Sequence, residues 1–460
     1  MAEEMITLDT LKMAAEIVKK GSRVKNLVRI PPRLYQAQPL AYTPLFVSVG
    51  PFHHIGPYSA KGQDGKNRFK DANILGSETK KQAYMFEFLQ SGDVYAATML
   101  EAFQQYLRAK LDEISNLYRE EIEISHETLA NIIILDSCFL LGFLASGAKD
   151  IMFSAFRRDL ALLENQVPFF VLVDFSFMIS NHVASKIHLG LLILHTFKLC
   201  PTFHLSPGYL DSGENIYAKE LGEDPYLSHV AKRVHDHVPD SIHLLDFIYR
   251  YHALQISARI EHNVPSKIPS SRAVRLRNAT KLSASGVTIE SAQVSSSHSV
   301  LKLSFSKGVL RIPPLLISDY TETLFINLLA HEHLSPNYRD YFTSYVFLMA
   351  QLIESEGDLQ LLEKKGIIHN ELGSRGDVSK LFSNIAKQFV LTDFFYSELC
   401  NEIEAYADST WQRHIQVLKE RYFSNPWATL SVFAATILLL LTFMQTFYTA
   451  LSYYQGGPPK

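Results

Sequence analysis

Apolar residues recur at helical spacing over most of the chain. They do so in residues 78–125, in residues 126–265, where turns separate four or five further helices, and again in residues 319–420. By contrast, residues 28–58 are rich in proline and aromatic residues and fit no helical period. Only the run LFVSVG at 45–50 predicts a short strand there, because a Gly-Pro pair follows it.

The region between the helical segments has a different pattern. Ten of the 34 residues from 266 to 299 are serine, and basic side chains outnumber acidic ones, so this stretch predicts a basic linker or mobile surface segment. Directly after it, Leu301, Leu303 and Phe305 alternate with polar residues ahead of Lys307-Gly308. Alternation followed by a turn signal predicts a β-hairpin.

One segment near the C-terminus is long and apolar enough to cross a membrane. No charged side chain lies between Arg421 and Lys460, and the 22 residues from Trp427 to Tyr448 would span about 33 Å as a helix. Aromatic residues flank both of its ends, as at membrane interfaces. Two other apolar runs, 132–145 and 189–199, are shorter and carry charged or polar residues, so we interpret them as buried core helices.

The charges beside this segment predict its orientation. Arg413, Lys419 and Arg421 precede it, whereas only Lys460 follows. The positive-inside rule then predicts a large domain in the cytosol and a tail anchor, inserted after translation into the lipid bilayer of the plasma membrane or an endomembrane. The sequon Asn278-Ala-Thr280 would receive a glycan only if the large domain were lumenal.

These patterns divide the chain into five parts and predict its fold class. The expected fold is mainly α: a large multi-helix lobed domain with a small β-hairpin element, plus one C-terminal transmembrane helix. The parts are an N-terminal amphipathic helix (1–27), a helical lobe with an N-terminal Pro/aromatic segment (28–265), the Ser-rich basic segment (266–299), a hairpin with a second helical lobe (300–422) and the transmembrane anchor (423–454).

Composition narrows the classes of function only a little. The 44 Lys and Arg residues nearly balance the 47 Asp and Glu residues, so we expect no nucleic-acid partner. Three widely spaced cysteines cannot form a disulfide framework. The acidic, interrupted N-terminus does not have the pattern of a secretory signal peptide.

Few residues are arranged like a catalytic or metal site. The sequence holds no phosphate-binding loop, no GxSxG elbow and no HExxH helix. Histidines cluster in three places, but each cluster offers two ligands, whereas a metal site needs three or four that converge. We therefore expect no metal and no other cofactor. The three clusters are His53-His54, His235 with His237, and His331 with His333.

Two places carry polar residues inside strongly apolar runs. Asp136 lies in the most apolar predicted helix, and a buried aspartate must be paired or neutral. In DLALLENQVPFFVL (159–172), Pro168 ends any helix, so the chain bends where Glu164, Asn165 and Gln166 can satisfy freed backbone groups. We interpret these five residues as a structural motif. The alternative is a site made by Asp136, Glu164, His53 and His54.

Six stretches, in order along almost the whole chain, resemble a plant-specific family, the domain of unknown function 247. They are RIPPRLYQAQPLAYTPLFVSVGPFHH (29–54), LDSCFLLGFL (135–144), DLALLENQVPFFVL (159–172), GVLRIPPLLISDYTETLFINLLAHEH (308–333), GDLQLLEKKGIIHNELG (357–373) and YFSNPWATLSVFAATILLLLTFMQTFYTALSYY (422–454). The LENQ-x-PFF motif, and NPWA followed by the terminal apolar segment, make the resemblance specific.

The resemblance implies a plant membrane protein of unknown biochemistry, and some grass members of the family are associated with self-incompatibility loci. It supplies no catalytic residues. We therefore predict a non-enzymatic, membrane-anchored interaction or signalling protein with protein partners, with cell recognition such as grass self-incompatibility as a candidate role. The alternative is a membrane-tethered enzyme with a site near Asp136, Glu164 and His53/His54.

The terminal apolar segment also carries a seam of eight residues at alternating three- and four-residue spacing, and all of them except Leu438 are small or polar. In lipid, helices associate through such small residues and through interhelical hydrogen bonds. We therefore expect this segment to form a homo-oligomer, with a span from another protein as the main rival partner. The seam consists of Ala428, Ser431, Ala435, Leu438, Thr442, Gln445, Thr449 and Ser452.

Overall fold

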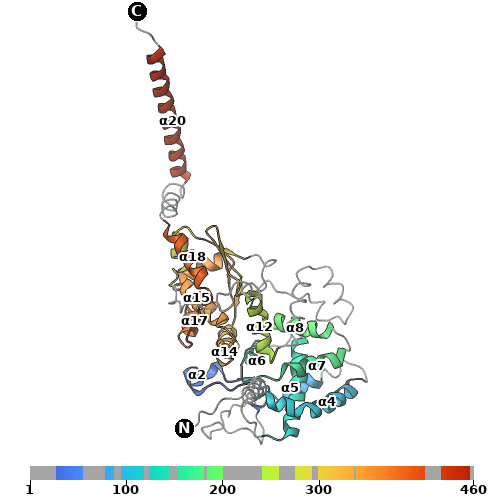
Figure 1. Cartoon of the computed structure of the whole chain (residues 1–460). Coiled ribbons are helices and arrows are strands. Elements are labelled where there is room, and N and C mark those ends of the chain that lie inside the picture. Colours follow the sequence, from blue (N-terminus) through green and yellow to red (C-terminus); the bar gives the residue numbers. More distant parts are fainter. Residues whose placement is uncertain are drawn as a thin grey trace, which may run out of the picture.

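The computed structural model describes most of the chain, and its element labels follow Figure 1. The described residues are 27–54, 78–86, 95–118, 124–145, 153–180, 184–199, 241–257, 275–292, 299–335, 338–409 and 426–455. The expected N-terminal amphipathic helix, the histidines at 235 and 237, and Cys200 lie outside these residues.

Helices build the N-terminal half, residues 27–257. They are α4 (Tyr95–Leu117), α5 (His126–Ala145), α6 (Phe153–Leu160), α7 (Phe169–Ser180), α8 (Ala184–Thr196) and α12 (Leu244–Ser257), with a further helical segment at 78–86. Helix α5 is apolar around its whole circumference, and most of its side chains are buried. A helix of this kind belongs at the centre of a core, and the expectation that run 132–145 is a buried helix is confirmed.

The first described segment, residues 27–54, is here called the strap. It contains α2 (Pro32–Ala37) and the short 3₁₀ helix η1 (Pro39–Ala41). The prediction of a strand at 45–50 is wrong, because none of these described residues belongs to a β-strand. Side-chain oxygens of Asp159, Asn165 and Asp136 accept their backbone N–H groups instead.

The C-terminal half, residues 275–409, combines helices with two small sheets. Strand β2 (Ser304–Ser306) pairs antiparallel with β3 (Val309–Ile312). The two residues that connect these strands, Lys307 and Gly308, each have a positive φ, as a two-residue hairpin turn requires. The expected hairpin is therefore confirmed. The alternation did not reveal that β1 (Thr288–Ser291) adds to β3 in parallel. Strands β4 (Leu315–Ile317) and β5 (Ile368–Asn370) form a separate parallel pair.

Part of the Ser-rich segment 266–299 is folded, which differs from the expectation of a linker. Residues 275–292 form α13 (Ala279–Ala284) and β1. The reason is a set of apolar residues placed between the serines, which are buried in the core: Leu276, Ala279, Leu282, Val287 and Ile289. The rest of the segment, apart from Ser299, lies outside the described residues.

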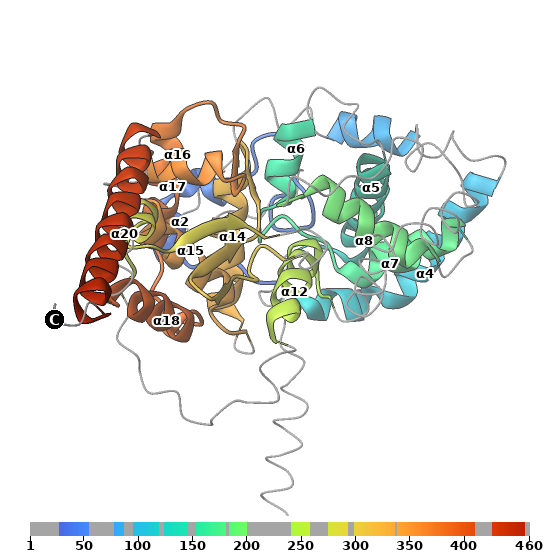
Figure 2. The ribbon, with the colours of Figure 1, turned by 90° about the horizontal axis from the view of Figure 1, so that it is seen from above.

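Among the described residues of this half, five further helices follow: α14 (Thr321–Leu334), α15 (Tyr341–Leu352), α16 (Glu356–Lys364), α17 (Arg375–Ala386) and α18 (Ser397–Asp408). Figure 2 shows this half on one side and α4, α5, α7 and α8 on the other, with α6 and α12 between them. Specific contacts join the halves. The guanidinium of Arg157 on α6 lies 3.9 Å from the ring centre of Tyr320, whose hydroxyl donates to the carbonyl of Lys198.

The last helix, α20 (Pro426–Gln455), stands away from the rest of the described residues (Figure 1). Its apolar stretch Phe433–Ser452 is long enough to cross a membrane and none of it is buried, whereas 72% of the comparable stretch of α5 is buried. The described chain is therefore mainly helical, with α20 as its candidate membrane span.

Candidate functional site

The strap is held in place by polar side chains of the 159–166 region. The carboxylate of Asp159, at the end of α6, accepts the N–H groups of Leu45, Phe46 and Val47 at 2.6–3.1 Å. Asp159 is fully buried, and Arg158 beside it supplies a compensating positive charge at 2.5 Å. One buried carboxylate thus replaces the neighbouring strand that these backbone groups would otherwise need.

Asn165 and Gln166 act on both the strap and their own bend. Asn165 accepts the N–H of Val49 at 2.5 Å and donates to the carbonyls of Val47 and Asp159. Gln166 donates to two carbonyls freed at the end of α6, and Pro168 directly precedes α7. These amides satisfy backbone groups that the bend leaves without helical partners.

Glu164 and His53 form a second buried contact with the strap. Oε2 of Glu164 lies 3.2 Å from Nε2 of His53, and Oε1 accepts the N–H of Ile30 at 2.5 Å. Burial alone would raise the pKa of Glu164, but the hydrogen bond and charge of His53 hold it below its usual value. His54 is half-buried, and burial lowers its pKa.

Asp136 is paired with a lysine that the pattern did not single out. Nζ of Lys81 lies 2.6 Å from Asp136 and 2.7 Å from Glu78, while the other oxygen of Asp136 accepts the N–H of Gly50 at 2.7 Å. Lys81 is 1% exposed. Burial works against its charge, but the two carboxylates hold the pKa of Lys81 above its usual value, so it is not a neutral nucleophile.

The candidate catalytic groups are therefore occupied by packing contacts with different partners. Asp136 accepts the N–H of Gly50 and pairs with Lys81, whereas Glu164 accepts the N–H of Ile30 and contacts the ring of His53. The void beside Asn165 and Gln166 has no room for a water-sized molecule. Catalysis requires a hollow in which titratable groups meet a substrate. Here the two carboxylates bind buried backbone N–H groups of the strap instead.

A further buried polar cluster lies where α12 meets α14, and the sequence pattern did not reveal it as a group. Oδ1 of Asp246 accepts from the hydroxyl of Tyr338 at 2.5 Å and lies 2.9 Å from Nε2 of His331. Oδ2 accepts from Arg250 and from the N–H of Ile242. The signal that could have found it is His243-x-x-Asp246 before an apolar run, a variant of the helix capping box.

The neighbouring His331-Glu332-His333 triplet does not converge on a point. His331 faces Asp246, whereas the ring of His333 contacts the carbonyls of Leu329 and Val390. Glu332 accepts the N–H groups of Phe342 and Thr343 at the start of α15, and burial raises its pKa to about 8. Within the described ranges no group of three or more His, Cys, Asp or Glu residues is arranged to hold a metal ion.

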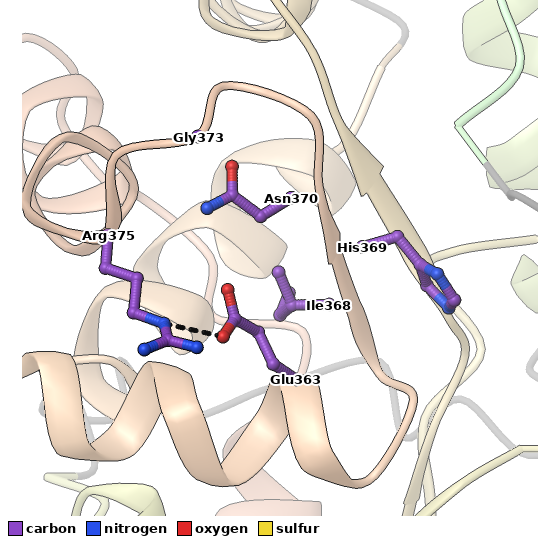
Figure 3. A pocket seen from close by; sticks show the side chains of 6 residues that line it. All are labelled: Glu363, Ile368, His369, Asn370, Gly373 and Arg375. Atoms are coloured by element: carbon purple, nitrogen blue, oxygen red, sulfur yellow. Dashed lines mark hydrogen bonds and ion pairs between the residues drawn. The ribbon is translucent and has the colours of Figure 1, made fainter.

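An open surface hollow of about 470 Å³ lies between α16, β5 and α17 (Figure 3). Glu363 and Arg375 form an ion pair of 2.8 Å across it, while Asn370 points into it and His369 points away. The Arg375 side chain is half-exposed. A solvent-exposed ion pair of this kind contributes little to protein stability. The hollow is open to solvent and so lacks the enclosed character of a typical ligand site.

Comparison with known proteins matches the family expected from the motifs. The model of the domain of unknown function 247, described as plant protein of unknown function, matches residues 27–441. In Arabidopsis thaliana, UPF0481 protein At3g47200 is 26% identical over 442 residues, which cover 93% of this chain and 86% of that protein. Putative UPF0481 protein At3g02645 is 24% identical over 494 residues, with coverage of 92% and 89%. No solved structure matches. Because the family model covers nearly the whole chain, the chain belongs to the plant domain of unknown function 247 family.

Proposed function

We propose that the chain is a non-enzymatic plant protein, anchored in a membrane by α20, whose folded body binds other proteins. The observation that carries this proposal is the contrast between its two long apolar helices. The side chains of α5 are used in the core, whereas none of the stretch Phe433–Ser452 of α20 is buried against the described residues. An apolar surface of this size needs lipid or a partner to cover it.

The anchor is tested by extracting membranes with alkaline carbonate, which releases peripheral proteins but not spanning ones. The full chain should stay in the membrane pellet. A variant with Leu439→Arg and Leu441→Arg should be released, because each arginine costs about 2.5–3.5 kcal/mol at the centre of a spanning helix. The matched control, Leu439→Ile with Leu441→Ile, should behave like the native chain. Release of the native chain would contradict the proposal.

A non-enzymatic role is supported by how the buried acids beside the strap are used. Asp136, Glu164 and Asp159 each accept strap N–H groups and also contact the side chains of Lys81, His53 and Arg158, respectively, so they contribute to folding rather than remaining available for chemistry. A membrane-tethered enzyme with a site near Asp136, Glu164 and His53/His54 is the alternative, and it would require the strap to leave these groups.

Protein partners, and the candidate role in cell recognition such as grass self-incompatibility, are tested by proximity labelling in native plant membranes. The control is the same labelling enzyme fused to residues 423–460 alone, which reports whatever merely shares the membrane. Proteins labelled by the full chain and not by the anchor would support recognition by the body. Identical protein sets from both fusions would contradict it.

A further inference from the structure

The open hollow between α16, β5 and α17 presents three polar side chains, and each of them has an atom that no described residue binds (Figure 3). Arg375, the first residue of α17, uses only Nε in its 2.8 Å contact with Oε2 of Glu363 on α16. Within the described part of the chain, the other two guanidinium nitrogens of Arg375 and Oε1 of Glu363 have no partner. This ion pair contributes little to stability, but it holds a donor and an acceptor side by side.

Asn370, the last residue of β5, supplies the third group. Its Oδ1 accepts the N–H of Leu372 at 2.9 Å, which identifies that end of the amide as the oxygen and leaves Nδ2 as a donor without a partner among the described residues. Figure 3 shows the amide of Asn370 pointing into the hollow and the ring of His369 pointing away. Each of the three side chains is thus held by one contact and keeps another atom unused, so little rotamer entropy is lost when a ligand binds.

The charges of the hollow indicate what kind of group it can hold. Glu363 offsets the charge of Arg375, so the pair does not favour a bare anion such as inorganic phosphate. Among the described residues, the unused atoms are instead donors from Arg375 and Asn370 beside one acceptor from Glu363. A matching ligand carries two acceptor oxygens next to an N–H. The last residue of a polypeptide chain has this arrangement, because its carboxylate and its backbone nitrogen are attached to the same carbon atom.

The shape of the hollow fits the end of a chain better than a small molecule. It has a volume of about 470 Å³ and is open to solvent, so it would enclose little of a compact ligand. Ile368 forms part of its wall, and Leu372 on the adjoining loop is 37% exposed. Beside Gly373, nothing lies within 4 Å of the position of an added Cβ atom, which leaves room for the preceding residues of a bound chain.

We propose that this hollow binds the C-terminal residue of a partner protein. The carboxylate of that residue accepts from the guanidinium of Arg375 and from Nδ2 of Asn370. Its backbone N–H donates to Oε1 of Glu363, and its side chain packs on Ile368. This inference rests on the proposed function, because it assigns to one place the protein binding proposed for the folded body.

The test uses the full chain in lipid nanodiscs and a library of random hexapeptides with free carboxyl termini, with empty nanodiscs as the blank. Peptides selected by the native chain are made again with an amidated C-terminus, which removes the charge. Amidation should weaken binding, measured by fluorescence anisotropy, by about tenfold or more, because hydrogen bonds to a charged group are lost. Arg375→Ala and Asn370→Asp should each have a similar effect. Asn370→Asp keeps the contact with Leu372 but replaces the donor by an acceptor.

Lys380→Ala is the matched control, because Lys380 is an exposed cation of the same helix that does not line the hollow. This variant should bind the peptides as the native chain does. The proposal is overturned if no peptide is enriched, if amidated peptides bind equally well, or if Arg375→Ala and Asn370→Asp both retain binding. Proximity labelling separates this result from the proposed function. Body-specific labelling that Arg375→Ala leaves unchanged would contradict this site alone, whereas identical labelling by the full chain and the anchor would contradict protein binding by the body.

Discussion

Gly50 passes so close to Gln166 that a Cβ atom on Gly50 would overlap the backbone carbonyl oxygen of Gln166. Gly50 also has a φ of 74°, which side chains disfavour. We predict that Gly50→Ala lowers the free energy of unfolding by at least about 2 kcal/mol more than Gly366→Ala. Gly366 is the matched control, because its φ is 67° but nothing lies within 4 Å of the added atom. Equal thermal unfolding midpoints for the two variants would show that the strap can move away.

The ion pair between Lys81 and Asp136 gives a second prediction. Lys81→Met leaves a buried carboxylate without its cation, which costs about 3–5 kcal/mol. Adding Asp136→Asn should recover part of this loss, because the amide is uncharged and still offers an oxygen to the N–H of Gly50. The exposed neighbour Lys80→Met should change stability by less than about 0.5 kcal/mol. Chemical denaturation of the solubilised chain measures all three, and a double variant no more stable than Lys81→Met would contradict the pairing.

The sequence predicted the helices well because their apolar periodicity reflects local geometry. The run 132–145 and the hairpin turn at Lys307-Gly308 both have signals within a few residues. The strap shows where such signals fail. LFVSVG resembles a strand, but its N–H groups bind Asp159, Asn165 and Asp136, which lie 86–116 residues away. No local pattern distinguishes that arrangement from a sheet.

The polar clusters were only partly predictable for the same reason. The bend at Asn165-Gln166 follows from Pro168, which acts locally. Lys81 meets Asp136, and Asp246 meets His331, only in the folded chain. Nothing near these residues in the sequence identifies their partners. The high serine content of 266–299 suggested a linker, although several apolar residues between the serines are buried in the core. Composition is an average over the segment and does not show which single positions are buried.

Buried His252 predicts a loss of stability in acid. Burial lowers its pKa in the folded chain to about 3, below the unfolded value of about 6.5. As pH falls below about 6.5, the unfolded chain binds a proton that the folded chain refuses, so stability decreases by up to about 1.4 kcal/mol per pH unit. His252→Phe should reduce the slope of the thermal midpoint against pH between about pH 6.5 and 5. An unchanged slope would mean that His252 ionises freely in the fold.

Orientation in the membrane needs a better reporter than the native sequon. The side chain of Asn278 is buried, caps α13 and donates to Glu354, so an absent glycan could reflect folding alone. We predict that an acceptor tag added after Lys460 becomes glycosylated in plant membranes, because the positive-inside rule places that end in the lumen. The same tag placed before Met1 should remain unmodified. The reverse pattern would contradict a cytosolic body.

The last prediction concerns contacts between copies of α20. The hydroxyls of Thr442, Thr446 and Thr449 donate to carbonyls four residues earlier in their own helix, so they need no second helix. Gln445 lies among them, and its side-chain amide has no bond within the described part of the chain.

In hydrocarbon such an amide gains by pairing with its copy on a neighbouring helix, for about 0.5–2 kcal/mol. A bacterial transmembrane-dimerisation reporter carrying residues 424–454 should therefore give a signal that Gln445→Leu weakens, while Met444→Leu, one position around the helix, leaves it unchanged. If the native span and Gln445→Leu both stay at the monomer baseline, the exposed face of α20 is covered by lipid or by a different protein.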